Sequence, residues 1–247
     1  MTRLLRILHG FVSLLSISAS ALVSCGGASA TPAPATATAP VHAHGQGDGH
    51  HGHAPLVHRF QNAETWAKEF DDPARDAWQK PADVVAAMQI SPGMLVADVG
   101  AGTGYFEPWL SRAVGAGGSV LAFDVEDDMV RYLRERGAKE HWENVTPGKV
   151  AFDDPKLPPG RVDRVLIVDT WHHIDAREAY AAKLLAGLSK NGTVLIVDFT
   201  LEATHGPPRM HRLAPEQVVR ELTAGGLVAE VLPTKLPEQY LVVGRRP

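Results

Sequence analysis

A glycine-rich turn is the first part of this 247-residue sequence that could do chemistry. Residues 95–104 read LVADVGAGTG, an apolar run that contains Asp98 and passes into three alternating glycines, Gly100, Gly102 and Gly104. Glycines let a backbone turn tightly and approach a ligand, and the first N–H groups of a following helix are free to bind an anion. The spacing therefore predicts a ligand-binding turn between a strand and a helix, and its G-x-G-x-G form differs from the G-x-G-x-x-G of dinucleotide-binding proteins.

Acidic and histidine side chains follow two further apolar runs. Asp124 comes directly after residues 120–123, and Asp169, His172 and His173 come after residues 162–168. An imidazole that titrates near neutral pH can accept a proton from a reacting group, and a neighbouring carboxylate can orient it. We therefore treat Asp169, His172 and His173 as the candidate catalytic residues, with the alternative that the two histidines only begin a helix and pack.

These side chains need a frame of strands, and the sequence supplies one from about residue 60 onward. Short apolar runs alternate with helical segments, which predicts βαβ units and a mainly parallel sheet. The runs at 162–168 and 193–198 are nearly continuous in apolar residues, as in central strands that are buried on both faces. We expect strands at Leu95–Val99, Val120–Phe123, Lys149–Phe152, Val162–Val168, Thr193–Asp198, Val228–Leu232 and Tyr240–Val243, and helices at Glu107–Val114, Asp128–Arg136, Ala176–Leu188 and Pro215–Ala224.

Two polar-rich helical segments, Ala63–Phe70 and Ala82–Met88, precede the sheet. We expect residues 60–90 to form a lid, with residues 75–81 folded over the ligand. Trp78 in this stretch either stacks on a ligand or packs in the core.

Five segments in order resemble motifs of the class I S-adenosylmethionine-dependent methyltransferases. They are residues 95–104, 120–124, 152–158, 162–168 with the Trp-His-His-Ile that follows, and 188–193. The resemblance covers about residues 90–245. It implies a Rossmann-like, doubly wound, mainly parallel seven-stranded sheet with helices on both faces and an antiparallel last strand.

The resemblance also implies a cofactor, S-adenosylmethionine, and the residues that hold it. Gly100, Ala101, Gly102 and Gly104 would clear space for its methionine and ribose portions, and Asp98 would bind the methionine ammonium. The ribose hydroxyls would meet Asp124 and Val125, and the adenine would meet Asp153 and Asp154. The implied reaction is methyl transfer to a small-molecule O, N or S acceptor, because the sequence holds no long insertion that would bind a large one.

The N-terminus resembles a bacterial lipoprotein signal peptide over residues 1–24. Arg3 and Arg6 precede an apolar run that is too short to cross a membrane. The run ends in Leu-Val-Ser-Cys, and Cys25 is the only cysteine in the chain. We expect acylation of Cys25, and hence a membrane-anchored lipoprotein that faces the periplasm or the outer membrane, against the alternative of an ordinary signal peptide.

Residues 25–59 are expected to form an unfolded tether between this anchor and a globular domain at 60–247. An Ala/Pro/Thr-rich spacer is followed by a tract that contains His42, His44, His50, His51 and His53. Neutral imidazoles suit Zn, Cu or Ni, so the tract is a weak candidate metal site. A solvated linker of biased composition is the alternative.

The composition excludes several classes of protein. The net charge of −4 argues against a nucleic-acid binder, and a single cysteine permits neither an internal disulfide nor a cysteine-based zinc site. Two other functions stay open. One is a non-catalytic, metal-binding envelope lipoprotein with a methyltransferase-like scaffold, because S-adenosylmethionine is made in the cytoplasm. The other is an NAD-dependent oxidoreductase, which also places an acid after its second strand.

Overall fold

The computed structural model describes residues 60–247. The predicted signal peptide, Cys25 and the histidines of the tether lie outside the described residues. None of the helices within 60–247 has the length and apolar character that a membrane span needs.

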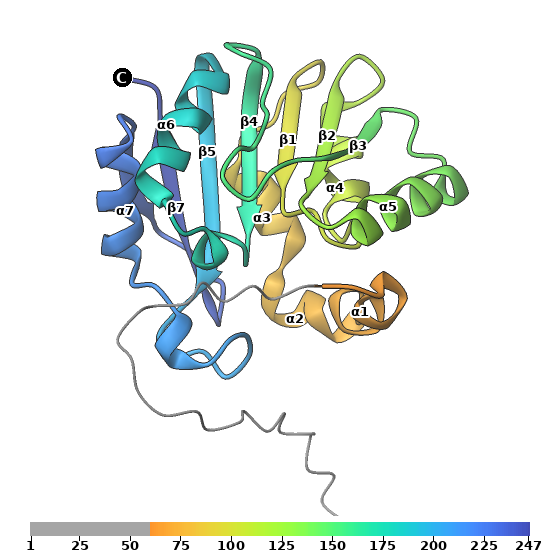
Figure 1. Ribbon diagram of the computed structural model, residues 1–247, viewed down its shortest axis with the longest axis horizontal. Helices are drawn as coiled ribbons and strands as arrows, with labels where there is room; N and C mark the ends of the chain where they lie inside the picture. The colour runs from red at the N-terminus through yellow and green to blue at the C-terminus, as the bar shows by residue number, and fades with distance from the viewer. Residues whose placement is uncertain (1–59) are drawn as a thin grey trace, which may run out of the picture. The chain divides into compact units, whose positions relative to one another are not determined.

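The core of the domain is one seven-stranded sheet with the order β3-β2-β1-β4-β5-β7-β6 (Figure 1). All neighbouring pairs are parallel except those of β7, which runs antiparallel to both β5 and β6. The mainly parallel seven-stranded sheet and its antiparallel last strand are therefore confirmed. The strands are β1 (Leu95–Val99), β2 (Ser119–Asp124), β3 (Val145–Lys149), β4 (Val162–Val168), β5 (Leu188–Phe199), β6 (Val228–Leu232) and β7 (Gln239–Arg245).

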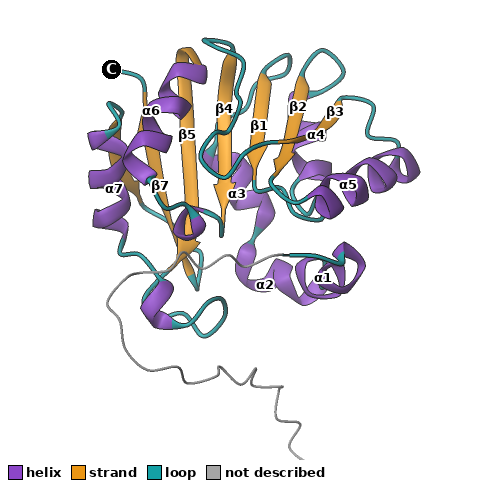
Figure 2. Cartoon of the chain, viewed as in Figure 1, coloured by secondary structure: helices purple, strands orange, loops and turns teal. Residues whose placement is uncertain are grey.

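Helices cover both faces of this sheet, as expected for a doubly wound fold (Figure 2). One face packs against α3 and α4 and the other against α6 and α7. Val120 and Ala122 lie two residues apart on β2 and contact α4 and α5 respectively, so α5 shares the face of α4. The helices are α1 (Ala63–Phe70), α2 (Asp76–Gln79), α3 (Pro81–Ala87), α4 (Glu107–Val114), α5 (Asp127–Glu140), α6 (Arg177–Gly187) and α7 (Pro215–Ala224).

The central strand β4 shows why its apolar run is continuous. Val165 and Ile167 face the cluster under α6 and α7, whereas Leu166 and Val168 face the cluster under α3 and α4. Because successive side chains point to opposite faces, both sets must be apolar when both faces are buried.

The prediction for the third strand was wrong. We expected Lys149–Phe152, whereas β3 is Val145–Lys149 and contains Pro147 and Gly148. Pro147 is tolerated because β3 is an edge strand that pairs only with β2. Gly148 is required by a close approach, since a Cβ there would lie 2.8 Å from the Phe123 ring.

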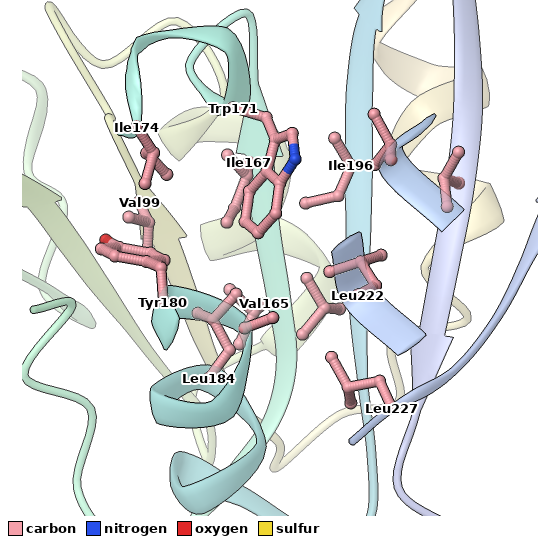
Figure 3. Packing of buried hydrophobic residues seen from close by; sticks show 14 of the residues in the cluster. Val99, Val165, Ile167, Trp171, Ile174, Tyr180, Leu184, Ile196, Leu222 and Leu227 are labelled. Atoms are coloured by element: carbon pink, nitrogen blue, oxygen red, sulfur yellow. The ribbon is translucent and has the colours of Figure 1, made fainter. Parts of the chain in front are cut away.

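Trp171 anchors the segment that follows β4 to the core between the sheet, α6 and α7 (Figure 3). It is fully buried, and its indole N–H donates to Glu221 Oε2 of α7 at 2.9 Å. Its neighbours include Ile167 of β4, Ile196 of β5 and Tyr180 of α6. The next two residues, His172 and His173, are thereby held at the carboxyl end of β4.

Candidate functional site

The candidate residues meet at the edge of the sheet where the parallel strands end. β1 and β4 are neighbours, and the chain leaves β1 toward β2 but leaves β4 toward β5, in the opposite direction along the sheet. Open α/β sheets bind ligands at such a switch point. In Figure 1, α1 and α2 lie at the same edge, toward which the arrowheads of β4 and β5 point.

The glycine turn between β1 and α4 has a backbone that only glycine fits easily. Gly100, Gly102 and Gly104 have φ values of +83°, +57° and +91°. A Cβ on Gly100 would lie 2.3 Å from Thr170 Oγ1, because the turn packs directly against the end of β4. A Cβ on Gly102 would meet only the Phe70 ring, at 3.6 Å, so at this position the turn faces the lid.

Asp124 fixes the shape of this turn. The Gly102 N–H donates to its Oδ2 and the Glu126 N–H to its Oδ1, both at 2.9 Å. Asp124 is buried, and burial raises the pKa of its carboxyl although backbone N–H groups of Glu126, Gly102 and Val125 lower it. Each carboxylate oxygen keeps a second lone pair for a hydroxyl group. Val125 is half-buried next to it.

Asp98 and Glu107 form a buried pair of carboxyl groups beneath the turn. Asp98 lies near the end of β1, and Glu107 is the first residue of α4. Both residues are almost fully buried. Burial raises the pKa of Asp98 to about 7. Burial and the charge of Asp98 raise the pKa of Glu107 well above its usual range. The two groups therefore hold a proton near neutral pH, and Glu107 is not among the site residues that the sequence predicts.

His172 is oriented by Asp198, which is not among the site residues predicted from the sequence. Its Nδ1 lies 3.0 Å from both carboxylate oxygens of Asp198, at the carboxyl end of β5. Both side chains are buried, with exposed fractions of 4% and 0%. Burial lowers the pKa of His172, but the hydrogen bond and charge of Asp198 outweigh it, and the pKa lies above its usual value. The rule that carboxyl ends of neighbouring parallel strands meet could have predicted this pair.

Asp169 does not make the hydrogen bond that the sequence suggested. It adopts a left-handed conformation with φ +50°, and its Oδ1 accepts from Gln239 Nε2 of β7 at 2.6 Å. Gln239 in turn accepts from Gln79 of α2 at 2.5 Å, and Arg75 lies 3.7 Å from Asp169 Oδ2. Burial raises the pKa of Asp169 to about 7, although the charge of Arg75 opposes this. Asp169 thus connects β4 to the lid, and Asp198 is the residue that orients His172.

His173 lies between His172 and an aromatic cluster of the lid. Its ring centroid is 4.2 Å from that of His172 and 5.8 Å from that of Phe60. Phe60, Trp66 and Phe70 pack on one another with centroid distances of 4.9 to 5.8 Å. Phe70 is the ring that faces Gly102. The lid therefore joins the glycine turn to the histidines.

The predicted adenine-binding residues lie in an exposed loop after β3. The Asp153 side chain is 79% exposed and pairs with Lys183 at 3.3 Å. Asp154 Oδ1 accepts the Lys156 N–H at 2.8 Å, and Phe152 is 59% exposed. Neither aspartate has a hydrogen bond to the glycine turn, but their loop begins beside Asp124, whose carbonyl accepts the Val150 N–H at 3.0 Å.

Trp78 was expected either to stack on a ligand or to pack in the core. Trp78 stacks on His205, at 5.3 Å and 13° between the rings, and tilts against Phe199. This places it between the lid and the segment after β5.

Among the residues from 60 onward, no group of three or more His, Cys, Asp or Glu side chains is arranged to hold a metal ion.

The raised pKa of Asp169 predicts how stability depends on pH. Because its pKa in the folded state is about 7, the native protein holds a proton that the unfolded chain releases near pH 4, and stability falls as the pH rises between these values. Asp169→Asn keeps an acceptor for Gln239 and suits the left-handed backbone. We expect it to raise the free energy of unfolding by about 1–3 kcal/mol at pH 8, a gain that shrinks steadily as the pH falls from 7 toward 4. Urea unfolding of both proteins at pH 4.5, 6 and 8 checks this, and a gain that does not change with pH would contradict it.

Comparisons with known proteins agree with this geometry. Residues 96–192 match the family described as "Methyltransferase domain". A methyltransferase described as SAM-dependent from Aquifex aeolicus has a similar structure, with a TM-score of 0.70 and 28% identity, over 74% of this chain and 98% of its own. A phosphoethanolamine N-methyltransferase from Haemonchus contortus, solved with S-adenosyl-L-methionine, shares the fold with a TM-score of 0.57 and 16% identity, over 69% of this chain and 53% of its own.

Among curated proteins, a ubiquinone/menaquinone biosynthesis C-methyltransferase from Shewanella pealeana is 29% identical over 110 residues, which are 44% of each chain. The chain thus spans less than half of the length of the curated relatives that it matches. The residues that match the methyltransferase-domain family run from β1 to the start of β5 and include the glycine turn, Asp124 and the two histidines. The described domain therefore has a Rossmann-like fold like that of S-adenosylmethionine-dependent methyltransferases, and residues 96–192 of it match the methyltransferase-domain family.

Proposed function

We propose that this protein transfers a methyl group from S-adenosylmethionine to a small-molecule O, N or S acceptor, with His172 as the general base. The observation that supports this most is a juxtaposition. The glycine turn shaped by Asp124 and the His172–Asp198 pair lie at one edge of the sheet, linked by the lid residues Phe60 and Phe70.

The residues present fit the cofactor. Gly102 has no Cβ between the turn and the Phe70 ring, and the Asp124 carboxylate keeps lone pairs for the two ribose hydroxyls. Asp98 is the proposed partner of the methionine ammonium, and the loop with Asp153 and Asp154, the proposed adenine-binding residues, follows β3, next to β2 and Asp124. When bound, the cofactor supplies an electrophilic methyl group on a sulfonium.

The His172–Asp198 pair is suited to remove a proton from the acceptor. Asp198 accepts the hydrogen of His172 Nδ1, which leaves Nε2 as the base, and no described residue donates to Nε2. As the acceptor atom formed its bond to the methyl carbon, the carbon–sulfur bond would break, the bonding electrons would leave with the sulfur of S-adenosylhomocysteine, and the proton of the acceptor would pass to Nε2. The buried Asp198 carboxylate then stabilises the imidazolium. The lid is shorter than the expected residues 60–90, because α3 packs on a face of the sheet. Residues 60–80 and the segment after β5 cover this edge, which favours a small acceptor (Figure 1).

We further propose that acylated Cys25 anchors the enzyme to the membrane on the periplasmic side or at the outer membrane. The support is the sequence alone: the apolar run, the Leu-Val-Ser-Cys ending and the absence of any other cysteine. A diacylated cysteine anchors a protein stably, unlike a single short chain. The same anchor would carry the histidine tract, with any Zn, Cu or Ni it binds, into the envelope.

Asp124→Ala is expected to weaken binding of S-adenosylmethionine at least tenfold, because it removes the ribose acceptor and releases the Gly102 N–H. Asp127→Ala is the matched control, since Asp127 is three residues away and its exposed carboxylate pairs, among the described residues, only with Lys149. Isothermal titration measures both affinities, and circular dichroism checks that each variant is folded. Wild-type affinity in folded Asp124→Ala protein would refute the proposed cofactor site.

Asp198→Asn is expected to lower the pKa of His172 below 6.5. Without the carboxylate, burial is the main remaining influence on the imidazole and disfavours its charged form. NMR titration of the ring nitrogens measures this pKa, with the exposed His205 as an internal reference.

With any acceptor that the wild type methylates, His172→Gln and Asp198→Asn should lower kcat at least a hundredfold and leave the affinity for S-adenosylmethionine unchanged. An unchanged pKa, or an unchanged kcat, would rule out the proposed base.

Cys25→Ser is expected to abolish labelling by radioactive palmitate and to move the protein from the membrane fraction to the soluble envelope fraction. Ser24→Ala is the control, because it keeps a small residue beside the cysteine. If Cys25→Ser leaves both labelling and fractionation as in the wild type, the lipoprotein proposal fails, and the proposed methyl transfer is untouched.

A further inference from the structure

Arg75 belongs to the lid and lies against the glycine turn. It ends a short 3₁₀ turn, Pro73–Arg75, between α1 and α2. Its guanidinium lies over the ring of Tyr105, a residue of the turn, at 4.1 Å from the centroid. Its side chain is only 14% exposed. The lid thus holds a positive charge directly against the proposed cofactor site.

The hydrogen bonds of Arg75 go to neutral groups only. Nε and Nη2 donate to Gln79 Oε1 at 3.1 and 2.9 Å, and Nη1 donates to the Phe70 carbonyl at 2.9 Å. The carboxylate of Asp169 is 3.7 Å away, beyond hydrogen-bond distance, and is bound to Gln239. One N–H on Nη1 and one on Nη2 therefore have no acceptor among the described residues. A cation removed from water without a bonded anion is costly, so the arrangement favours an anionic ligand.

The other arginines of the lid interface differ in this respect. Arg136 donates to Asp71 and Glu140, each at 2.9 Å, and Arg131 donates to Asp128, Glu64 and Glu135 at 2.9 Å or less. These two arginines brace the lid against α5 with their charges matched. Arg75 has the same general location, but the Asp169 carboxylate that pairs with it lies 3.7 Å away and accepts no hydrogen bond from it.

The proposed cofactor carries an anion that the rest of the site does not match. Its methionine portion has an ammonium and a carboxylate, and the buried acid Asp98 suits only the ammonium. The turn itself contains no cationic residue between Gly100 and Phe106. Arg75 is close enough to Asp98 for its charge to act on that carboxyl group. A zwitterion could therefore span Asp98 and Arg75, with one charged group at each.

We propose that Arg75 binds the methionine carboxylate of the cofactor through its free Nη1 and Nη2 N–H groups, so that cofactor binding and lid position depend on each other. This rests on the proposed function. The chemistry is that of a charge-assisted arginine–carboxylate pair, which forms two parallel hydrogen bonds. Gln79 positions the guanidinium from its other edge, and through Gln239 it links the guanidinium to Asp169 at the end of β4.

A cycle of protein and ligand changes tests this. The two ligands are S-adenosylhomocysteine and its decarboxylated analogue, which keeps the amine but lacks the carboxylate. Isothermal titration gives the affinity ratio of the two ligands for the wild type, Arg75→Gln and Arg75→Lys. The control is Arg112→Gln, because Arg112 lies on α4 over Trp109 and makes no hydrogen bond to the turn.

We expect the wild type and Arg112→Gln to prefer S-adenosylhomocysteine over the decarboxylated analogue by about tenfold to a hundredfold. Arg75→Gln should bind both ligands equally, and Arg75→Lys should keep part of the preference. The ratio is internal to each variant, so a partly unfolded preparation lowers both affinities alike and leaves the ratio intact.

Two results would overturn the inference. If Arg75→Gln keeps the wild-type ratio, Arg75 only holds the lid or serves an anionic group of the acceptor, and the proposed cofactor site survives. If the wild type binds neither ligand, the proposed function fails, and the inference fails with it.

Discussion

The hydrogen bond from the Gly102 N–H to the Asp124 carboxylate is the interaction on which the rest of the site depends. It joins the turn after β1 to the end of β2, and the Phe123 carbonyl adds two bonds, from the N–H groups of Gly100 and Ala101 at 2.8 and 3.0 Å. With this shape fixed, the turn can pack against Thr170 on one side and face Phe70 of the lid on the other. The same aspartate thus shapes the turn and presents a carboxylate beside it.

This arrangement requires buried carboxyl groups with raised pKa values and one residue with an unfavourable backbone conformation. Asp98 and Glu107 are buried together, and burial raises the pKa of both carboxyl groups. Asp169 has a left-handed backbone conformation and a raised pKa. Such features lower stability and are tolerated where they serve a site. Their location is consistent with this view, because all three lie at the carboxyl edge of the sheet, close to the glycine turn or to the end of β4.

Local patterns predicted most of the frame, and contacts distant in sequence explain what they missed. The run at 162–168 revealed β4 because burial on both faces leaves a continuous apolar signal. The edge strand β3 was misplaced because Pro147 and Gly148 argue against a strand unless its edge position is known. Asp198 was missed although the order of the strands could have paired it with His172. The contact between Gln79 and Gln239 joins residues 160 positions apart, and no local pattern reports it.

Titration of the full-length protein with S-adenosylmethionine, and in parallel with NAD, tests the central claim most directly. If the glycine turn and Asp124 form the cofactor site of a methyltransferase, one molecule of S-adenosylmethionine binds per chain, S-adenosylhomocysteine competes with it, and NAD does not bind. Saturable binding of NAD without binding of S-adenosylmethionine, or binding of neither, would contradict the account.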